Sequence, residues 1–409
     1  MGRAISQEAF EALVKENMED LGMEPDEALE DAIETLTLQG VDLSGIIKCI
    51  PGVNSVKDNP VIQLIDGLKN NENLEKMIEM LDKLYDLCST EGSDNASIAI
   101  KNGGVELLTS LCSSLDVKFD RPLALALKAL SSILCDVQSS ESFRQSGGPK
   151  IVVDILHGSS ECLNLLDSGF AVVAAASAGN EIVKESFMDL KLDEYIMEIL
   201  REKSKYDVQH IYDAIRILLT PDDNRVLASQ VYGYARKFAK IGVANVLVDV
   251  LRVGVDSARL ASTCASLKAI AVNLAGSDAN KSAIVQLNGL DRLMKLSSRF
   301  SEDPSVMQEV MSIITVLSLR SPENAARAIE AGAGDLAIQA MQKFPSSYQM
   351  QRQSCLMIRN LVVRNPENRT ILLSNGIEKL IRKAKGVHET CKDAATAALR
   401  DLGLDNYNI

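Results

Sequence analysis

Three histidines, eight cysteines and a few glycine-rich turns are the residues of this chain that could carry metal, nucleophilic or phosphate chemistry. The histidines form no HExxH motif or Cys/His cluster, so they predict no catalytic or metal site. They are His157, His210 and His388. The run Gly147-Gly148-Pro149-Lys150 lacks the first glycine spacing and the Lys-Ser/Thr ending of a phosphate loop. We therefore predict no enzyme, no bound metal and no cofactor.

The cysteines are scattered singly, and no two of them form a CxxC pair. Cys112 and Cys355 lie within apolar helical patterns, which is typical of buried reduced thiols. No apolar run reaches the ~18 residues that a membrane-spanning helix needs, and no apolar signal segment is present. We predict a protein of the cytoplasm, with the nucleus as a second location and no membrane partner.

Charge is distributed unevenly along the chain. Residues 1–40 hold 11 acidic and two basic side chains, whereas residues 351–400 hold ten basic and four acidic ones. The basic stretch lacks interleaved aromatic residues, and the whole chain is acidic, with a pI near 4.9. These features disfavour nucleic-acid binding and favour protein partners, towards which charge steers association.

The elements that must position these side chains are helices. Hydrophobic residues make up 46% of the 409 residues, but aromatics only 4%, and alanine and aliphatic residues suit helix packing. Two amphipathic helices are predicted at 6–20 and 25–39, followed by a linker rich in Pro, Asn and Gly. We predict an acidic helical segment or cap at 1–50, a linker at 51–60 and helical repeats from 61 to 409.

The repeats are marked by an Asn, about eight residues of helix, and then a Gly followed by an aliphatic or small residue. The pairs are Asn95 and Gly103, Asn280 and Gly289, Asn324 and Gly332, and Asn368 and Gly376. Asn280, Asn324 and Asn368 are 44 residues apart, and so are Asn180 and Asn224. A period of this length with only helical patterns indicates an armadillo or HEAT solenoid, here of about seven to eight units. We expect each Asn to begin a helix.

The period is broken twice. A mark near Ser139 gives steps of 44 and 41 before Asn180, and the step from Asn224 to Asn280 is 56. The second break places an insertion near 225–241, and insertions in repeat proteins often map to the binding face. Its candidate partner-binding residues are Arg225, Tyr232, Tyr234, Arg236 and Lys237.

The joints and alanine-rich helices from residue 61 onward resemble armadillo repeats. Several stretches are similar in more detail to the armadillo repeat-containing protein 6 family, and they are Ile5–Phe10, Glu16–Glu19, Gln39–Ser44, Thr220–Arg225, Met357–Val362 and Ala397–Gly403. This resemblance implies an all-α superhelical solenoid with an accessory N-terminal segment and non-catalytic protein binding. It supplies no catalytic residues.

One departure concerns the armadillo proteins that receive nuclear-transport peptides. Those proteins use a ladder of Trp and Asn on their third helices, but this chain has no Trp. Asn360 occupies the Asn position, Val316 takes it one repeat earlier, and Asn273 fits only if a loop is shortened. A peptide receptor of that type is therefore disfavoured.

We predict a monomeric scaffold or adaptor that holds a segment of another protein on the concave face lined by the third helices. The C-terminal candidates are Arg359, Asn360, Arg364 and Arg400. Two alternatives stay open. In one, the acidic N-terminal segment competes with partners and makes the adaptor autoinhibited. In the other, an enzyme or small-molecule site lies in the curve of the solenoid, although no motif supports it and we predict no small-molecule substrate.

Overall fold

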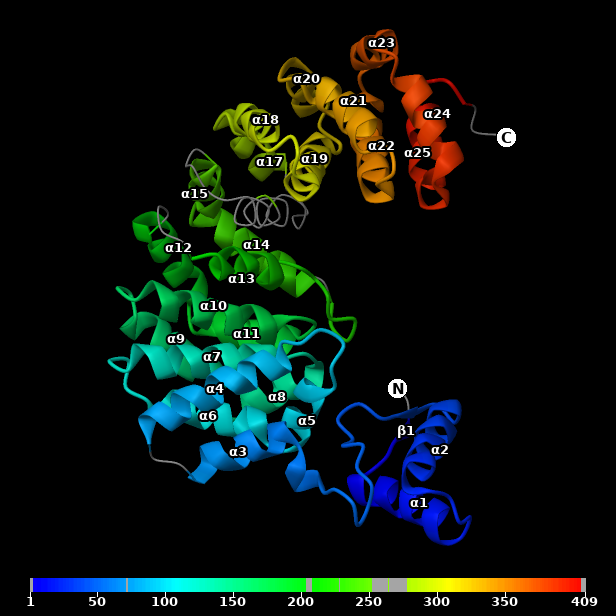
Figure 1. The fold of residues 1–409 in the computed structure, drawn as a ribbon. Coiled ribbons are helices and arrows are strands. Elements are labelled where there is room, and N and C mark those ends of the chain that lie inside the picture. The colour runs from blue at the N-terminus through cyan, green and yellow to red at the C-terminus, as the bar shows by residue number, and fades with distance from the viewer. Residues whose placement is uncertain are drawn as a thin grey trace. The chain divides into compact units, whose positions relative to one another are not determined.

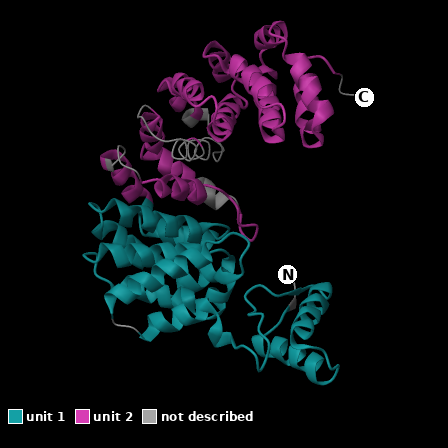
Figure 2. Ribbon diagram, viewed as in Figure 1, with its two compact units in different colours: residues 1–192 teal, residues 193–409 magenta. Residues whose placement is uncertain are grey.

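The computed structural model describes residues 3–70, 73–203, 208–227, 229–251, 264 and 278–405. It divides into two compact units, residues 1–192 and residues 193–409 (Figure 2). In the described parts the only strands are β1 (Arg3–Ala4) and β2 (Val41–Asp42), which pair in parallel. All other regular elements are helices (Figure 1), so the predicted all-α class is confirmed.

The N-terminal segment is a helical hairpin with a core of its own. It consists of α1 (Gln7–Glu19) and α2 (Pro25–Leu38), and the Ser6 hydroxyl accepts the Ala9 amide at the start of α1. The buried members of the core are Phe10, Val14, Ala28, Ala32, Leu36 and Ile46. Gln7 closes the hairpin, because its amide donates to the Ile47 carbonyl and accepts from the Ile47 amide, both at 2.9 Å.

Residues that follow the hairpin attach it to the repeats of the same unit. The Lys101 Nζ donates to the Ser44 carbonyl at 2.6 Å, and the Lys48 Nζ lies 2.8 Å from the Asp94 carboxylate. Lys101 belongs to α5 (Asn95–Lys101), and Asp94 immediately precedes that helix. The predicted linker contains a short 3-10 helix, η1 (Val56–Asp58).

Each repeat consists of a short first helix, a second helix of intermediate length and a long third helix. Unit 1 continues with α3 (Pro60–Asn70), α4 (Leu74–Cys88), α6 (Gly104–Ser114), α7 (Asp120–Ile133), α8 (Val137–Gln145), α9 (Gly148–Gly158), α10 (Leu163–Ser177) and α11 (Glu181–Asp189). The next helices are α12 (Leu192–Lys203), α13 (His210–Leu218), α14 (Ser229–Lys240), α15 (Val243–Val250), α17 (Asp278–Gln286), α18 (Gly289–Arg299) and α19 (Pro304–Ser318). The last two repeats contain α20 (Pro322–Glu330), α21 (Ala333–Lys343), α22 (Tyr348–Val362), α23 (Pro366–Ser374), α24 (Ile377–Val387), η2 (Glu389–Cys391) and α25 (Lys392–Asp401).

The third helices stack on one another in each unit. In unit 1, α7 packs between α4 and α10, and in unit 2, α22 packs between α19 and α25 (Figure 1). The alanines of α7 are buried, and their small side chains let the neighbouring helices approach closely. The cores therefore run lengthwise through each unit, as in a solenoid.

A residue with left-handed backbone separates the first helix of a repeat from the second. These residues are Gly103, Gly147, Lys191, Gly242, Asn288, Gly332 and Gly376, and successive positions differ by 44, 44, 51, 46, 44 and 44. The sequence analysis did not predict the joint at Lys191, because this position holds a lysine in place of the expected glycine. The predicted break near Ser139 is wrong, since the steps there are both 44. The extra residues lie between Lys191 and Gly242, an interval that includes 225–241.

At some joints a second glycine follows the first, and it is needed for close packing and not for its backbone conformation. Gly148 begins α9 next to the buried Phe143 ring, and a Cβ on this glycine would lie 2.1 Å from that ring. The pair Gly147-Gly148 therefore combines one residue selected for its backbone conformation with another selected for close packing.

The repeated asparagines have a role that differs from the predicted one. Asn324 and Asn368 lie inside the first turns of α20 and α23, where they are buried. Their Nδ2 atoms donate to the Leu317 and Leu361 carbonyls, at 3.1 and 2.8 Å, near the ends of the preceding third helices. They thus satisfy carbonyls that a helix end leaves without a partner.

The other marks show why the sequence period was misread. Asn95 donates to the Leu87 carbonyl in the same manner, at 2.9 Å. Asn180 alone of the described marks caps a helix, because its side chain accepts the Val183 amide. Asn224 lies in a turn before α14, so its spacing of 44 from Asn180 does not mark equivalent positions.

Candidate partner-binding surface

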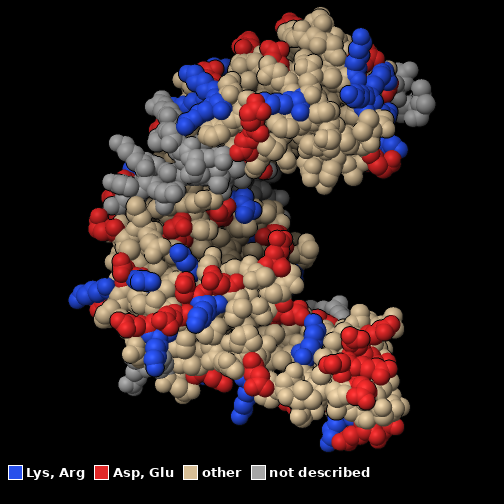
Figure 3. All heavy atoms as spheres, in the orientation of Figure 1, with Lys and Arg blue, Asp and Glu red and all other residues tan. Residues whose placement is uncertain are grey.

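The third-helix face of the last repeats is the surface to which the predicted C-terminal residues belong. On α22 the residues that are not buried on this face are Arg352, Gln353, Leu356, Arg359, Asn360 and Val363, the last of these directly after the helix. This row combines amides and aliphatic side chains with two arginines. Figure 3 shows a broad uncharged area over α22 and its neighbours, with both basic and acidic side chains at its edges.

Arg359 and Arg400 come together around Asp401. The Asp401 side chain is only 4% exposed, and it accepts from the Arg359 Nε at 3.2 Å and from the Arg400 Nε at 3.0 Å. Arg359 lies on α22, whereas Arg400 and Asp401 lie on α25, so this cluster joins two successive third helices. The buried carboxylate fixes both guanidinium groups, which remain partly exposed.

Asn360 links α22 to the preceding third helix. Its Nδ2 donates to the Thr315 carbonyl of α19 at 2.9 Å, and the Gln353 Nε2 donates to the Thr315 hydroxyl at the same distance. The amide donors of Asn360 and Gln353 are thus directed toward α19, along the same face. The sequence did not single out Gln353, but its place two turns before Asn360 on one helix face could have revealed it.

The ladder position is occupied by different residue types along the chain. Two residues before the end of a third helix lie Ser131 in α7, Ala175 in α10, Val316 in α19 and Asn360 in α22. The sequence around Asp401 aligns with that around Asn360, which places the buried acid at the same position in α25. Asn273 lies outside the described residues. The positions held by Ser131, Ala175, Val316 and Asp401 therefore lack the repeated amide of a peptide receptor.

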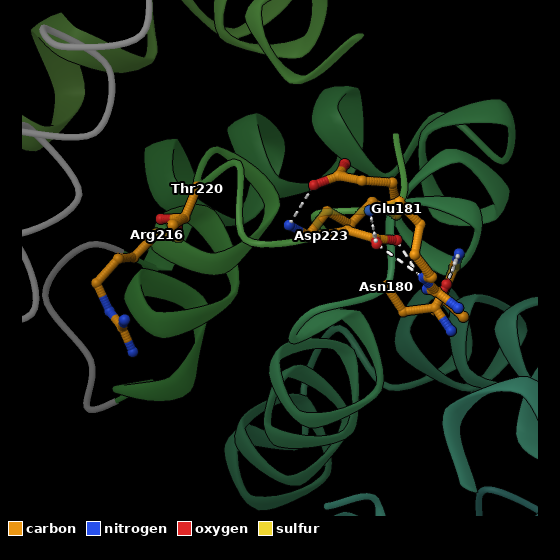
Figure 4. Close-up of polar contacts among 8 residues, drawn as sticks. Asn180, Glu181, Arg216, Thr220 and Asp223 are labelled. Carbon is orange, nitrogen blue, oxygen red and sulfur yellow. Dashed lines mark hydrogen bonds and ion pairs between the residues drawn. The ribbon is translucent and has the colours of Figure 1, made fainter. Parts of the chain in front are cut away.

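The remaining predicted residues are dispersed. Arg364 is exposed in the turn after α22. Arg225 pairs with Asp223 two residues earlier in the loop before α14, with its Nη2 at 2.7 Å from the carboxylate (Figure 4). This pairing orders the loop and already engages the guanidinium.

Within α14 the predicted residues divide between core and surface. Arg236 and Lys237 are exposed, but Tyr234 is only 7% exposed. The expectation that Tyr234 belongs to a surface patch is therefore wrong, because its side chain is buried, as is that of Phe238 one turn later. The Tyr232 side chain lies outside the described residues. α14 has 12 residues, compared with nine in α8, α11 and α20.

The groups that could carry other chemistry are accounted for by packing. Six of the eight free cysteines are buried, as predicted, and burial raises the pKa of Cys112 to about 12. The buried Lys184 pairs with the buried Glu181 at 3.0 Å on one turn of α11 (Figure 4). Among the described residues no cluster of His, Cys, Asp and Glu is suited to a metal ion. No described helix is long and apolar enough to cross a membrane.

The arrangement of three-helix units around stacked third helices defines an armadillo-repeat protein, and solved structures agree. A designed armadillo repeat protein is 18% identical with a TM-score of 0.50, and it covers 62% of this chain and 98% of its own. A chain from a structural study of the cadherin and β-catenin interaction is 15% identical with a TM-score of 0.58, and the match covers 84% of this chain and 64% of that one. At these identities the likeness concerns the fold.

The sequence comparisons show a more particular similarity. The family model of the Armadillo repeat-containing protein 6 N-terminal domain matches residues 2–63. Armadillo repeat-containing protein 6 of Homo sapiens is 25% identical over 393 residues, which cover 91% of this chain and 76% of that protein. Its homolog in Drosophila melanogaster is 24% identical over 379 residues, 81% of each chain. The chain is thus similar to armadillo repeat-containing protein 6 over most of its length, and its N-terminal residues match the N-terminal domain of that family.

Proposed function

We propose that this chain is a non-catalytic scaffold that binds an extended segment of a partner protein on the third-helix face of α19, α22 and α25. The observation that carries the proposal is the cluster in which Asp401 holds Arg359 and Arg400 on a face otherwise formed by amides and aliphatic side chains. A fixed guanidinium loses less conformational entropy when it binds a carboxylate than a mobile one does. The partner segment therefore combines acidic with aliphatic residues.

The family and the fold support protein binding in general terms. The structural relative from the cadherin and β-catenin study carries the same fold in a protein–protein interaction. Because the Asn360 amide nitrogen donates to α19, this residue contributes to the third-helix face mainly through its shape and its carbonyl oxygen.

Proximity labelling in cells tests this proposal with charge-changed variants. The variant Arg352→Glu/Arg359→Gln alters the third-helix face and leaves the Arg400 pair with Asp401 in place. The matched control is Lys295→Glu, which alters an exposed cation on the second helix α18. We expect a subset of labelled proteins to be lost with the double variant and kept with the control. Identical labelling by all three proteins would refute the proposed surface.

Regulation by the acidic N-terminal segment is a second hypothesis. The hairpin has its own core, and the Ser44 carbonyl and Lys48 are held next to α5, so release of the segment would require these contacts to break. Deletion of residues 1–50 distinguishes the two roles. A gain in partner affinity supports competition, whereas a loss of stability with unchanged affinity supports a structural cap.

A further inference from the structure

One buried position of the third helices changes from apolar to polar in α22. Four residues after the N-cap, four other third helices carry a buried apolar side chain, namely Met77 in α4, Leu123 in α7, Leu166 in α10 and Met307 in α19. In α22 the same position holds Gln351, which is 4% exposed. A polar side chain at a packed position requires hydrogen-bond partners, so its environment explains why it is tolerated.

The amide nitrogen of Gln351 is fully used. Its Nε2 donates to the Met341 and Phe344 carbonyls, each at 2.9 Å, at the C-terminal end of α21. Since both acceptors are carbonyl oxygens, the orientation of the amide group is fixed by this network. Within the described residues the Gln351 Oε1 accepts no hydrogen bond, although solvent can reach it.

A hollow of about 210 Å³ lies between the ends of α21 and α24, and Gln351 is one of the residues that line it. Its apolar walls are Met341, Pro345, Leu380, Ala384 and Val387. Val387 is 62% exposed, so this wall of the hollow is open to a partner side chain. The volume is below the roughly 300 Å³ at which small-molecule sites begin, so the hollow suits a single side chain better than a metabolite.

The rim of the hollow is basic. Lys383 lines it, and Lys379 lies one turn earlier on the same exposed face of α24. In the described part of the chain neither lysine has an ion-pair partner, whereas the neighbouring Arg382 is engaged by Glu378 and Asp405. Two cations without counter-charges beside an apolar hollow favour an acidic partner segment.

We propose that the hollow receives a tyrosine side chain from an acidic segment of a partner protein. The aromatic ring supplies the apolar body for the walls, and its hydroxyl donates to the Gln351 Oε1, the acceptor that the packing leaves without a donor. Carboxylates beside the tyrosine face Lys379 and Lys383. Gln351 thus acts as the specificity-determining residue of a site formed mainly by second helices.

This hollow is separate from the third-helix face proposed above as the partner-binding surface. Gln351 and Asn360 lie nine residues apart on α22, which is about 13 Å along a helix. The side chain of Gln351 is buried toward α21, whereas Asn360 bonds to α19. Loss of binding in the hollow therefore tests this inference without testing binding on the third-helix face.

Methyl NMR of the full chain with p-cresol and toluene as probes tests the hydroxyl contact. We expect p-cresol to shift the Leu380 and Val387 methyl signals, with an affinity about tenfold lower for Gln351→Met, because one buried hydrogen bond is lost. Toluene should bind both proteins equally. If p-cresol binds both proteins with equal affinity, or shifts neither methyl, the inference is wrong.

Two further measurements keep the test decisive if Gln351→Met does not fold. Val387→Glu changes an exposed wall residue, and it should abolish p-cresol binding while the melting temperature stays unchanged. A synthetic peptide with one tyrosine among glutamates should bind wild type at least about tenfold better than its Tyr→Phe counterpart. Its affinity should also fall in Lys383→Glu. Equal binding of the two peptides would overturn the assignment.

Discussion

Asn368 offers a direct test of why an asparagine recurs in these repeats. The side chain is 4% exposed, and its Nδ2 donates to the Leu361 carbonyl at 2.8 Å and to the Ala325 carbonyl at 3.3 Å. Asn368→Ala removes the donor. Ala325 lies inside α20, whose own hydrogen bonds continue to use its carbonyl, but Leu361 lies at the end of α22. One buried carbonyl therefore loses its partner, at a cost of about 2 kcal/mol.

The matched control is Asn365→Ala, three residues earlier. Asn365 also donates to a carbonyl of the preceding repeat, that of Pro322 at 2.8 Å, but the contact is exposed, and the side chain caps no helix. Water can replace this bond, so the expected loss is about 0.5 kcal/mol or less.

Urea unfolding and hydrogen exchange measure the two losses. Repeat proteins can unfold in parts, so exchange in α22 and α23 must locate the effect that the urea midpoint reports. We expect faster exchange in these helices for Asn368→Ala and unchanged exchange in unit 1. Equal losses for both variants, or a loss below about 0.5 kcal/mol for Asn368→Ala, would refute the capping role of the buried asparagine.

Three other predictions concern packing, buried charge and pH. Gly148→Ala should destabilise unit 1 by about 1–3 kcal/mol, measured by urea unfolding, because the added Cβ meets the buried Phe143 ring. Glu181→Ala should cost about 1–3 kcal/mol in the same assay, because it takes away a carboxylate that accepts from the buried Lys184. Burial raises the pKa of Cys112 from 9.0 to about 12, so between these pH values the folded thiol keeps a proton that the unfolded thiol loses. Stability should therefore fall as pH rises above 9, by at most about 1.4 kcal/mol per unit for this thiol, and urea midpoints of Cys112→Ala should show a shallower fall.

The repeat architecture could be predicted because its marks are local. A residue that must adopt left-handed backbone is usually glycine, so Gly103 and Gly376 can be read from the sequence. Lys191 and Asn288 occupy the same conformation without glycine, and no local pattern identified Lys191. Asn180 misled the count, because an N-cap asparagine and a buried asparagine three positions later in the repeat have the same letter.

The candidate surface could be predicted only in part. Arg359 and Asn360 follow from their position on a third helix, but the fixing of Arg359 by Asp401 depends on packing between repeats 42 residues apart. Tyr234 shows the opposite failure, since an aromatic residue in an unusual helix can fill the core as readily as a surface. Gln351 has no sequence signal of its own, and only comparison of equivalent helix positions shows that it is exceptional.

The N-terminal hairpin is folded by one kind of interaction and attached to the first repeats by another. Its shape depends on buried apolar side chains, whereas Lys48 and Lys101 attach the residues that follow it to the first repeats through exposed ionic and polar contacts. Salt screens exposed ion pairs and leaves hydrophobic burial largely intact. Ionic strength, or a change in the charge of either lysine, can therefore alter the attachment without altering the hairpin. Mutations can therefore change the strength of the attachment and the stability of the hairpin separately over evolutionary time.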